Sequence, residues 1–129
     1  MSRRTLLGWA AILSVLGITA WASSPWWPFG GGGLAWIPGG DKGGHVLVLG
    51  ALAAACVLAF TGARVAGHRL GAAHVLALVA LGATADELAQ AFIPSRSFDL
   101  ADLAASLVGI AVLGGAAALL VRRREGART

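Results

Sequence analysis

Four long apolar stretches, separated by short polar segments, limit the possible folds of this sequence more than any other feature does. They run over residues 6–22, 43–60, 70–92 and 100–121. Each has close to the 20 or so residues that a helix needs to cross about 30 Å of hydrocarbon at about 1.5 Å per residue. Backbone groups in lipid find no water, and a helix satisfies them internally. The sequence therefore predicts an all-α, four-helix transmembrane bundle.

Composition favours a bilayer over water as the solvent of this chain. Only 12% of the 129 residues are charged and 57% are hydrophobic, whereas soluble domains average about 25% charged residues. A membrane β-barrel is not expected, because its strands would alternate apolar and polar residues. We predict a single membrane domain over residues 1–129, located in the cell membrane as a multi-pass protein.

The positions of lysine and arginine predict the orientation. If both termini are cytoplasmic, only Lys42 and Arg96 lie outside, as the positive-inside rule requires. The cytoplasmic set is then Arg3, Arg4, Arg64, Arg69, Arg122, Arg123, Arg124 and Arg128. The net charge of +4 does not indicate nucleic acid as a partner, because the basic residues form short separate clusters and not one continuous face.

The N-terminal residues allow a second interpretation, in which the first stretch is a cleaved signal peptide. Arg3 and Arg4 would form its basic region, and Ala20-Trp21-Ala22 would form a small-residue cleavage site. The run Ser2-Arg3-Arg4-Thr5-Leu6-Leu7 also resembles a twin-arginine signal. Cleavage would leave three spans without changing the orientation of the rest.

Two further features concern the surface and the packing of the spans. The segment 23–40 is rich in tryptophan and is expected to lie along the outer interface, because indole rings prefer the headgroup level. Small residues lie four apart in the last span, at Ala105 and Gly109 and at Ala111 and Gly115. Such pairs can let helices approach closely, but in a chain this rich in alanine and glycine they do not identify an interface.

Acidic residues are concentrated at the predicted outer ends of the last three spans. Five of the six belong to this set: Asp41, Asp86, Glu87, Asp99 and Asp102. Ionisable groups at membrane depth are costly, so they normally face the bundle interior or a wet cavity. Spacings of three or four residues place Asp41 beside His45, and Asp86 and Glu87 beside Gln90. We therefore predict a polar site at the extracytoplasmic face.

Simpler roles compete with function at several of these positions. Asp41 and Asp99 could act only as helix caps, and Lys42 could extend to the lipid headgroups. Arg96 could pair with a nearby aspartate or bind a lipid phosphate. Adjacent carboxylates inside an apolar helix have no capping role, which favours a functional role at residues 86–87.

Three motifs in these segments resemble those of the VanZ-like family. Asp41-Lys42-Gly43-Gly44-His45 resembles its D-K-x-x-H motif, and Asp86-Glu87-Leu88-Ala89-Gln90 resembles its D-E-x-x-Q motif. Residues 96–102, followed by Ser106 and Gly109, resemble its R-x-x-D-x-x-D-x-x-x-N-x-x-G segment. Ser106 stands where the family usually has asparagine, and a serine lacks the paired donor and acceptor of an amide.

The resemblance implies a small multi-span membrane protein with a role in the cell envelope. The founding member of the family is associated with low-level resistance to the glycopeptide teicoplanin, so antibiotic resistance is an implied phenotype. The resemblance supplies no mechanism.

Two hypotheses of function follow from the predicted site. In the first, the protein is an enzyme acting on a lipid-linked or cell-wall substrate, with Glu87 or Asp86 as general base and His45 as the complementary acid or base. In the second, it is a non-catalytic protein that binds a lipid headgroup, a glycopeptide or a partner protein. In the second hypothesis Arg96 and the tryptophan-rich segment would matter most, and Glu87→Gln should be tolerated. The residues assigned to substrate binding are Asp41, Lys42, Gln90, Arg96, Asp99, Asp102 and Ser106.

Cofactors and partners are less constrained by the sequence. The outer carboxylates would suit a cation that prefers oxygen ligands, but no spacing demands one, so no metal ligand is assigned and the cofactor is left open. Membrane lipids are expected partners. Transport is a weaker third option, because four short spans would need a dimer and no broken-helix repeat is visible. A homo-oligomer is kept as an alternative.

Overall fold

The computed structural model describes residues 1–22, 38–94 and 96–128, and over these residues the chain is mostly helical. The helices are α1 (Arg3–Ala22), α2 (Gly40–Phe60), α3 (Ala72–Gln90), α4 (Leu100–Gly109) and α5 (Gly115–Gly126). A π-helical turn, η2 (Ile110–Gly114), joins α4 to α5, so these three form one continuous helix. The all-α prediction is confirmed. The predicted tryptophan-rich interfacial segment lies almost wholly outside the described residues.

Three of the helices are long and apolar enough to cross a membrane, namely Gly40–Phe60, Ala72–Gln90 and Leu100–Gly126. They correspond to the second, third and fourth predicted spans, with ends shifted by a few residues. Large apolar side chains are exposed along them, among them Leu47, Leu78 and Val112, and lipid is the environment that matches such a surface. The span predicted at residues 6–22 is the 20-residue helix α1; that it crosses the membrane stays a prediction.

Helix α2 is the central element of the bundle. Helices α1, α3 and α4–α5 all pack against it, and α3 also packs against α4. Between the described parts of α1 and those of α3 or α4 there is no close backbone approach. The core lies between α2, α3 and α5, where Cys56, Val57, Val75 and Ala117 are buried together. Helix α1 is therefore a peripheral element attached along one side of α2.

Glycines allow the closest contact in the bundle, between α2 and α4. A methyl group on Gly109 would collide with the carbonyl oxygen of Val46, and one on Gly50 would lie 2.8 Å from the carbonyl oxygen of Gly109. The two backbones can meet here because neither residue has a side chain. Gly115 has nothing within 4 Å of the corresponding position, so of the two small-residue pairs noted in the sequence only the one containing Gly109 belongs to an interface.

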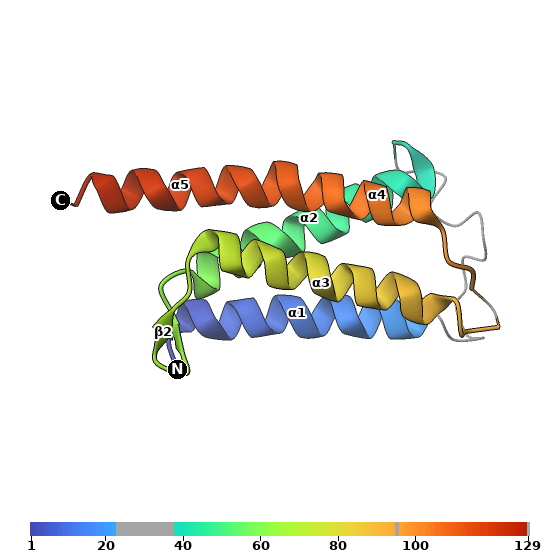
Figure 1. Cartoon of the computed structure of the whole chain (residues 1–129), viewed down its shortest axis with the longest axis horizontal. Helices are drawn as coiled ribbons and strands as arrows, with labels where there is room; N and C mark the ends of the chain where they lie inside the picture. The colour runs from blue at the N-terminus through green and yellow to red at the C-terminus, as the bar shows by residue number, and fades with distance from the viewer. Residues whose placement is uncertain (23–37, 95, 129) are drawn as a thin grey trace.

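A short β-hairpin joins α2 to α3. Strands β1 (Arg64–Val65) and β2 (His68–Arg69) are antiparallel, and the turn residues Ala66 and Gly67 have φ angles of 49° and 83°, which suits a tight two-residue turn. The hairpin lies at the same end of the bundle as the start of α1 and the end of α5, while α2 and α4 begin at the opposite end (Figure 1). The bundle thus has a basic end and an acidic end.

Candidate functional site

The first turns of α2 place one set of polar residues at the acidic end. Gly39 and Gly40 have φ angles of 83° and 62°, and this turn directs the chain into the helix. Asp41 lies in the first turn, where a negative charge is favoured by the helix dipole. The i, i+4 spacing then places Asp41 Oδ2 3.9 Å from His45 Nε2.

The start of α4 supplies the residues that face them. Asp99 is the N-cap of α4, and its Oδ1 accepts a 2.7 Å hydrogen bond from the backbone amide of Ala101. This hydrogen bond holds the pKa of the Asp99 carboxyl below its ordinary value, and the nearby charge of Lys42 lowers the pKa further. The capping role considered from the sequence is confirmed for Asp99 and is wrong for Asp41, because the N-cap of α2 is Gly39. Asp102 and Ser106 follow at spacings that keep them on the α2 side of the helix.

Lys42 joins the two helix starts. Its Nζ lies 3.3 Å from Asp102 Oδ1 and 3.7 Å from Asp99 Oδ2. The amine therefore forms ion pairs with two carboxylates at the start of α4. The Lys42 side chain is about half exposed. Because these two ion pairs connect α2 to the start of α4, they help to position α4 against α2.

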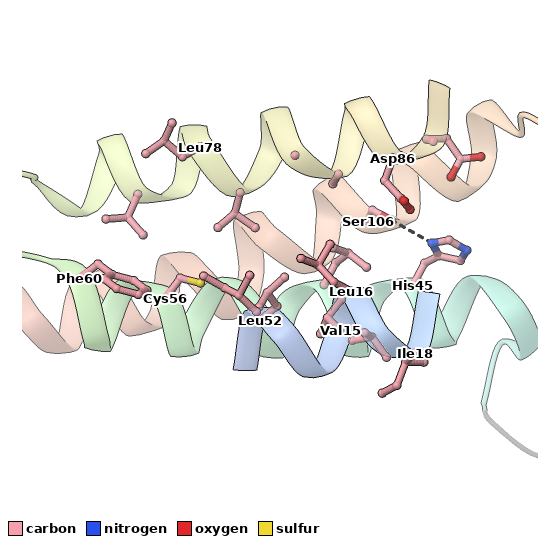
Figure 2. A pocket seen from close by; sticks show the side chains of 18 of the residues that line it. Val15, Leu16, Ile18, His45, Leu52, Cys56, Phe60, Leu78, Asp86 and Ser106 are labelled. Atoms are coloured by element: carbon pink, nitrogen blue, oxygen red, sulfur yellow. Dashed lines mark hydrogen bonds between the residues drawn. The ribbon is translucent and has the colours of Figure 1, made fainter. Parts of the chain in front are cut away.

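His45 contacts polar side chains from both α2 and α4. Its Nδ1 lies 3.1 Å from Ser106 Oγ, and its Nε2 lies 3.8 Å from Asp102 Oδ2. The side chains of His45 and Asp102 are 17% and 15% exposed, and Ser106 is buried. The imidazole ring is thus held between a hydroxyl on one side and the carboxylates of Asp41 and Asp102 on the other. Figure 2 shows the contact with Ser106.

The end of α3 contributes a second group of polar residues. Glu87 is buried, and its Oε1 accepts a 3.0 Å hydrogen bond from the backbone amide of Asp99. The Nε2 of Gln90 donates a 3.1 Å hydrogen bond to Asp86 Oδ2. Glu87 therefore fastens the N-cap of α4 to α3, a positioning contact that the sequence did not predict.

The predicted site residues fall into two groups in the structure. The hydrogen bonds and ion pairs of His45 within the described residues all come from α2 and α4, so His45 does not touch the carboxylates of Asp86 and Glu87 that were predicted as its catalytic partners. Asp86, Glu87 and Arg96 instead line a cavity together with His45 and Ser106. The two groups are connected by this cavity and by the hydrogen bond from the backbone amide of Asp99 to Glu87.

This cavity has a volume of about 580 Å³ and extends from the polar cluster along the inside of the bundle. Apart from its polar end, the lining is almost entirely apolar and comes from α1, α2 and α3; it includes Ile12, Leu16, Leu52, Cys56, Phe60 and Val79. Figure 2 shows His45, Ser106 and Asp86 at one end, and Cys56 and Phe60 toward the other. It lies between α1 and α3, which pack on α2 without approaching each other. The sequence did not predict it, because its lining resembles that of any membrane span.

Fold and site together define a small helical membrane protein with a polar cluster at one end of the bundle and an apolar cavity leading from it. Comparisons with protein-family models, with curated proteins and with solved structures each return no match. The VanZ-like resemblance of the three motifs therefore stays a prediction.

Proposed function

We propose that this protein is a VanZ-like integral membrane protein whose polar site, at the extracytoplasmic face, takes a lipid-linked substrate of the cell envelope. The observation that carries the proposal is the continuity between the polar cluster and the apolar cavity. Hydrocarbon of the substrate would occupy the cavity between α1 and α3, and its headgroup would meet the cluster around His45.

The dimensions of the cavity support a lipid occupant. From His45 to Phe60, both of which line it, helix α2 rises about 22 Å at about 1.5 Å per residue. That is most of the roughly 30 Å thickness of the hydrocarbon region. A site for a water-soluble glycopeptide alone would not need an apolar cavity of this depth.

The distribution of charged residues supports the proposed orientation of the bundle in the membrane and a phosphate or carboxylate in the substrate headgroup. The basic hairpin and the arginines of α5 favour the cytoplasm for their end of the bundle, which assigns the acidic end to the outer face. Arg96 and His45 both line the cavity, and a guanidinium suits a phosphate or carboxylate of the headgroup. Catalysis, if it accompanies binding, rests on His45 as the general acid or base.

Binding can be tested with variants that fill the cavity. Leu52→Trp places a large ring in the middle of the cavity, and it should reduce several-fold the envelope lipid that co-purifies with the protein, measured by native mass spectrometry. Leu81→Trp is the matched control, because Leu81 is 66% exposed on the outer surface of α3. Equal lipid recovery from wild type and Leu52→Trp would refute lipid binding in the cavity.

A non-catalytic binding protein is the second candidate, and one observation favours it. Glu87 accepts a hydrogen bond from the backbone amide of Asp99, so it has a structural role in positioning the start of α4. Lipid and cell-wall profiles of a deletion strain, complemented by wild type, His45→Ala or Glu87→Ala, separate the two candidates. A modified lipid that disappears with His45→Ala while the lipid still binds indicates an enzyme; an unchanged profile with altered glycopeptide tolerance indicates a binder.

A further inference from the structure

Three possible metal ligands converge at the outer end of α2 and α4. They are Asp41 Oδ2, His45 Nε2 and Asp102 Oδ2, and the ligand atoms offered by these residues lie within 4.8 Å of one another. We propose that this trio binds a divalent transition-metal ion of the zinc or manganese type. Ion binding does not depend on the proposed lipid substrate, so the two proposals can fail separately. With an ion bound, His45 acts as a ligand and not as the general acid or base considered above, because both of its ring nitrogens are engaged.

The spacing of the three atoms suits an ion better than direct hydrogen bonds. His45 Nε2 lies 3.8 Å from one carboxylate oxygen and 3.9 Å from the other, and both distances exceed those of hydrogen bonds. Two atoms that are each about 2.1 Å from one ion lie roughly 3.0 to 3.4 Å apart at angles of about 90° to 109°. Each His45–carboxylate pair would therefore close by less than about 1 Å to reach coordination distances, and the two carboxylate oxygens, which lie within 4.8 Å of each other, would close by up to about 1.8 Å.

The contact between Ser106 and His45 is an independent observation that points to the same ligand. A metal-binding histidine usually donates its other ring N–H to a fixed acceptor, and the buried Ser106 Oγ, 3.1 Å from Nδ1, can be that acceptor. Nε2 then presents its lone pair toward two carboxylates. With this tautomer, three electron-rich atoms face one another, and a divalent cation between them would neutralise the two carboxylates.

The second carboxylate is held in a similar way. Lys42 Nζ contacts Asp102 Oδ1 at 3.3 Å, which leaves Oδ2 directed at His45. His45 and Asp102 thus each have one polar atom held by a neighbouring residue and a second polar atom directed toward the proposed ion. Partners of this kind orient the ligands of metal sites and maintain their affinity.

The donor set defines the class of ion and the type of site. One imidazole with two carboxylates suits zinc or manganese, whereas calcium takes six to eight oxygen ligands. Two carboxylates and a neutral histidine balance the charge of a divalent ion. Three protein ligands leave coordination positions open, as in catalytic zinc sites. Asp41 and His45 also line the cavity, so an open position would face the headgroup of the proposed substrate.

The test is metal binding by the purified full-length protein in detergent micelles, after removal of any affinity tag and stripping with a chelator. Titration calorimetry with Zn²⁺ and with Mn²⁺ should detect one site per chain for at least one of them. His45→Ala, Asp102→Asn and Asp41→Asn should each weaken binding at least tenfold, and Ser106→Ala should weaken it by about 10- to 100-fold.

Two controls keep the result interpretable. Asp86→Asn removes an acid from the same end of the bundle but outside the trio, and it should leave the affinity unchanged. Asp41 is 60% exposed, so Asp41→Asn tests the site even if variants of the more buried residues fail to fold. Absence of binding by wild type, binding that survives the trio substitutions, or equal loss in Asp86→Asn would each overturn the proposal.

Discussion

At the scale of single residues, the site depends on side chains that position others. Ser106 orients His45, Glu87 holds the N-cap of α4, and Lys42 bridges Asp99 and Asp102. The sequence identified all six of these residues as members of the site. Five stand out as ionisable groups near the ends of apolar helices, where they are costly, and Ser106 was included through its position in the VanZ-like motif. It could not predict which of them touch, because contacts between separate helices are not encoded in local spacing.

Substitutions at Ser106 test its positioning role on the proposed substrate. Ser106→Ala removes the partner of His45 Nδ1, and the loss of one hydrogen bond of about 0.5–1.5 kcal/mol should weaken lipid binding by roughly 3- to 10-fold. Ser106→Asn, which introduces the residue usual in the VanZ-like family, should restore much of the affinity because its amide can bond the same nitrogen. Lipid affinity measured in nanodiscs checks both. An alanine variant that binds as tightly as wild type would contradict this role.

Glu87 can be assigned as a structural or a catalytic residue by two substitutions. Glu87→Ala leaves the backbone amide of Asp99 without its acceptor and should lower the free energy of unfolding by about 1–3 kcal/mol. Glu87→Gln keeps an acceptor oxygen, so we expect stability near wild type and an unchanged envelope phenotype. Unfolding in mixed micelles and the phenotype of the complemented strain measure the two effects. Loss of phenotype in a stable Glu87→Gln variant would instead identify Glu87 as a base.

At the scale of elements, helix packing was the least predictable part of the fold. The positions of α2, α3 and the long α4–α5 helix follow from apolar length alone. The close contact at Gly50 and Gly109 does not, because many other small residues in the chain have the same spacing. The hairpin between α2 and α3 was also missed, since its strands have only two residues each.

A methyl group at the α2–α4 contact should separate these helices. Gly109→Ala would push against the backbone of Val46, which cannot move aside as a side chain can. We expect a loss of about 1–3 kcal/mol in stability, measured as a lower thermal unfolding midpoint in detergent by tryptophan fluorescence. Gly115→Ala, in open space, is the matched control. Equal midpoints for the two variants would show that the contact is not close in solution.

At the scale of the whole molecule, the bundle separates basic and acidic residues. The start of α1 and the end of α5 lie at the basic end together with the hairpin (Figure 1). In the proposed orientation the basic end faces the cytoplasm, because positive residues favour that side. The apolar blocks and the charge distribution predicted that basic and acidic residues separate to opposite ends of the helices, whereas the cavity required the three-dimensional positions of α1 and α3.

Reporter fusions test the orientation directly. We expect green fluorescent protein attached at either terminus to fluoresce and alkaline phosphatase attached there to be inactive, because both termini should be cytoplasmic. A phosphatase inserted in the loop between α3 and α4, near Arg96, should be active. An active phosphatase at the C-terminus would invert the orientation and move the acidic end to the cytoplasm.

The peripheral position of α1 has a consequence for access. Among the described residues, α1 approaches no helix other than α2. If α1 crosses the membrane as predicted, its far edge would face the bilayer, and the cavity behind it would border the acyl chains of the surrounding leaflet. A lipid could therefore pass sideways between α1 and α3, keeping its tail in oil throughout. Such lateral entry would spare the substrate the cost of crossing water. Because α1 and α3 are too far apart for a disulfide, joining cysteines introduced on the two helices with a longer bifunctional cross-linker would block it.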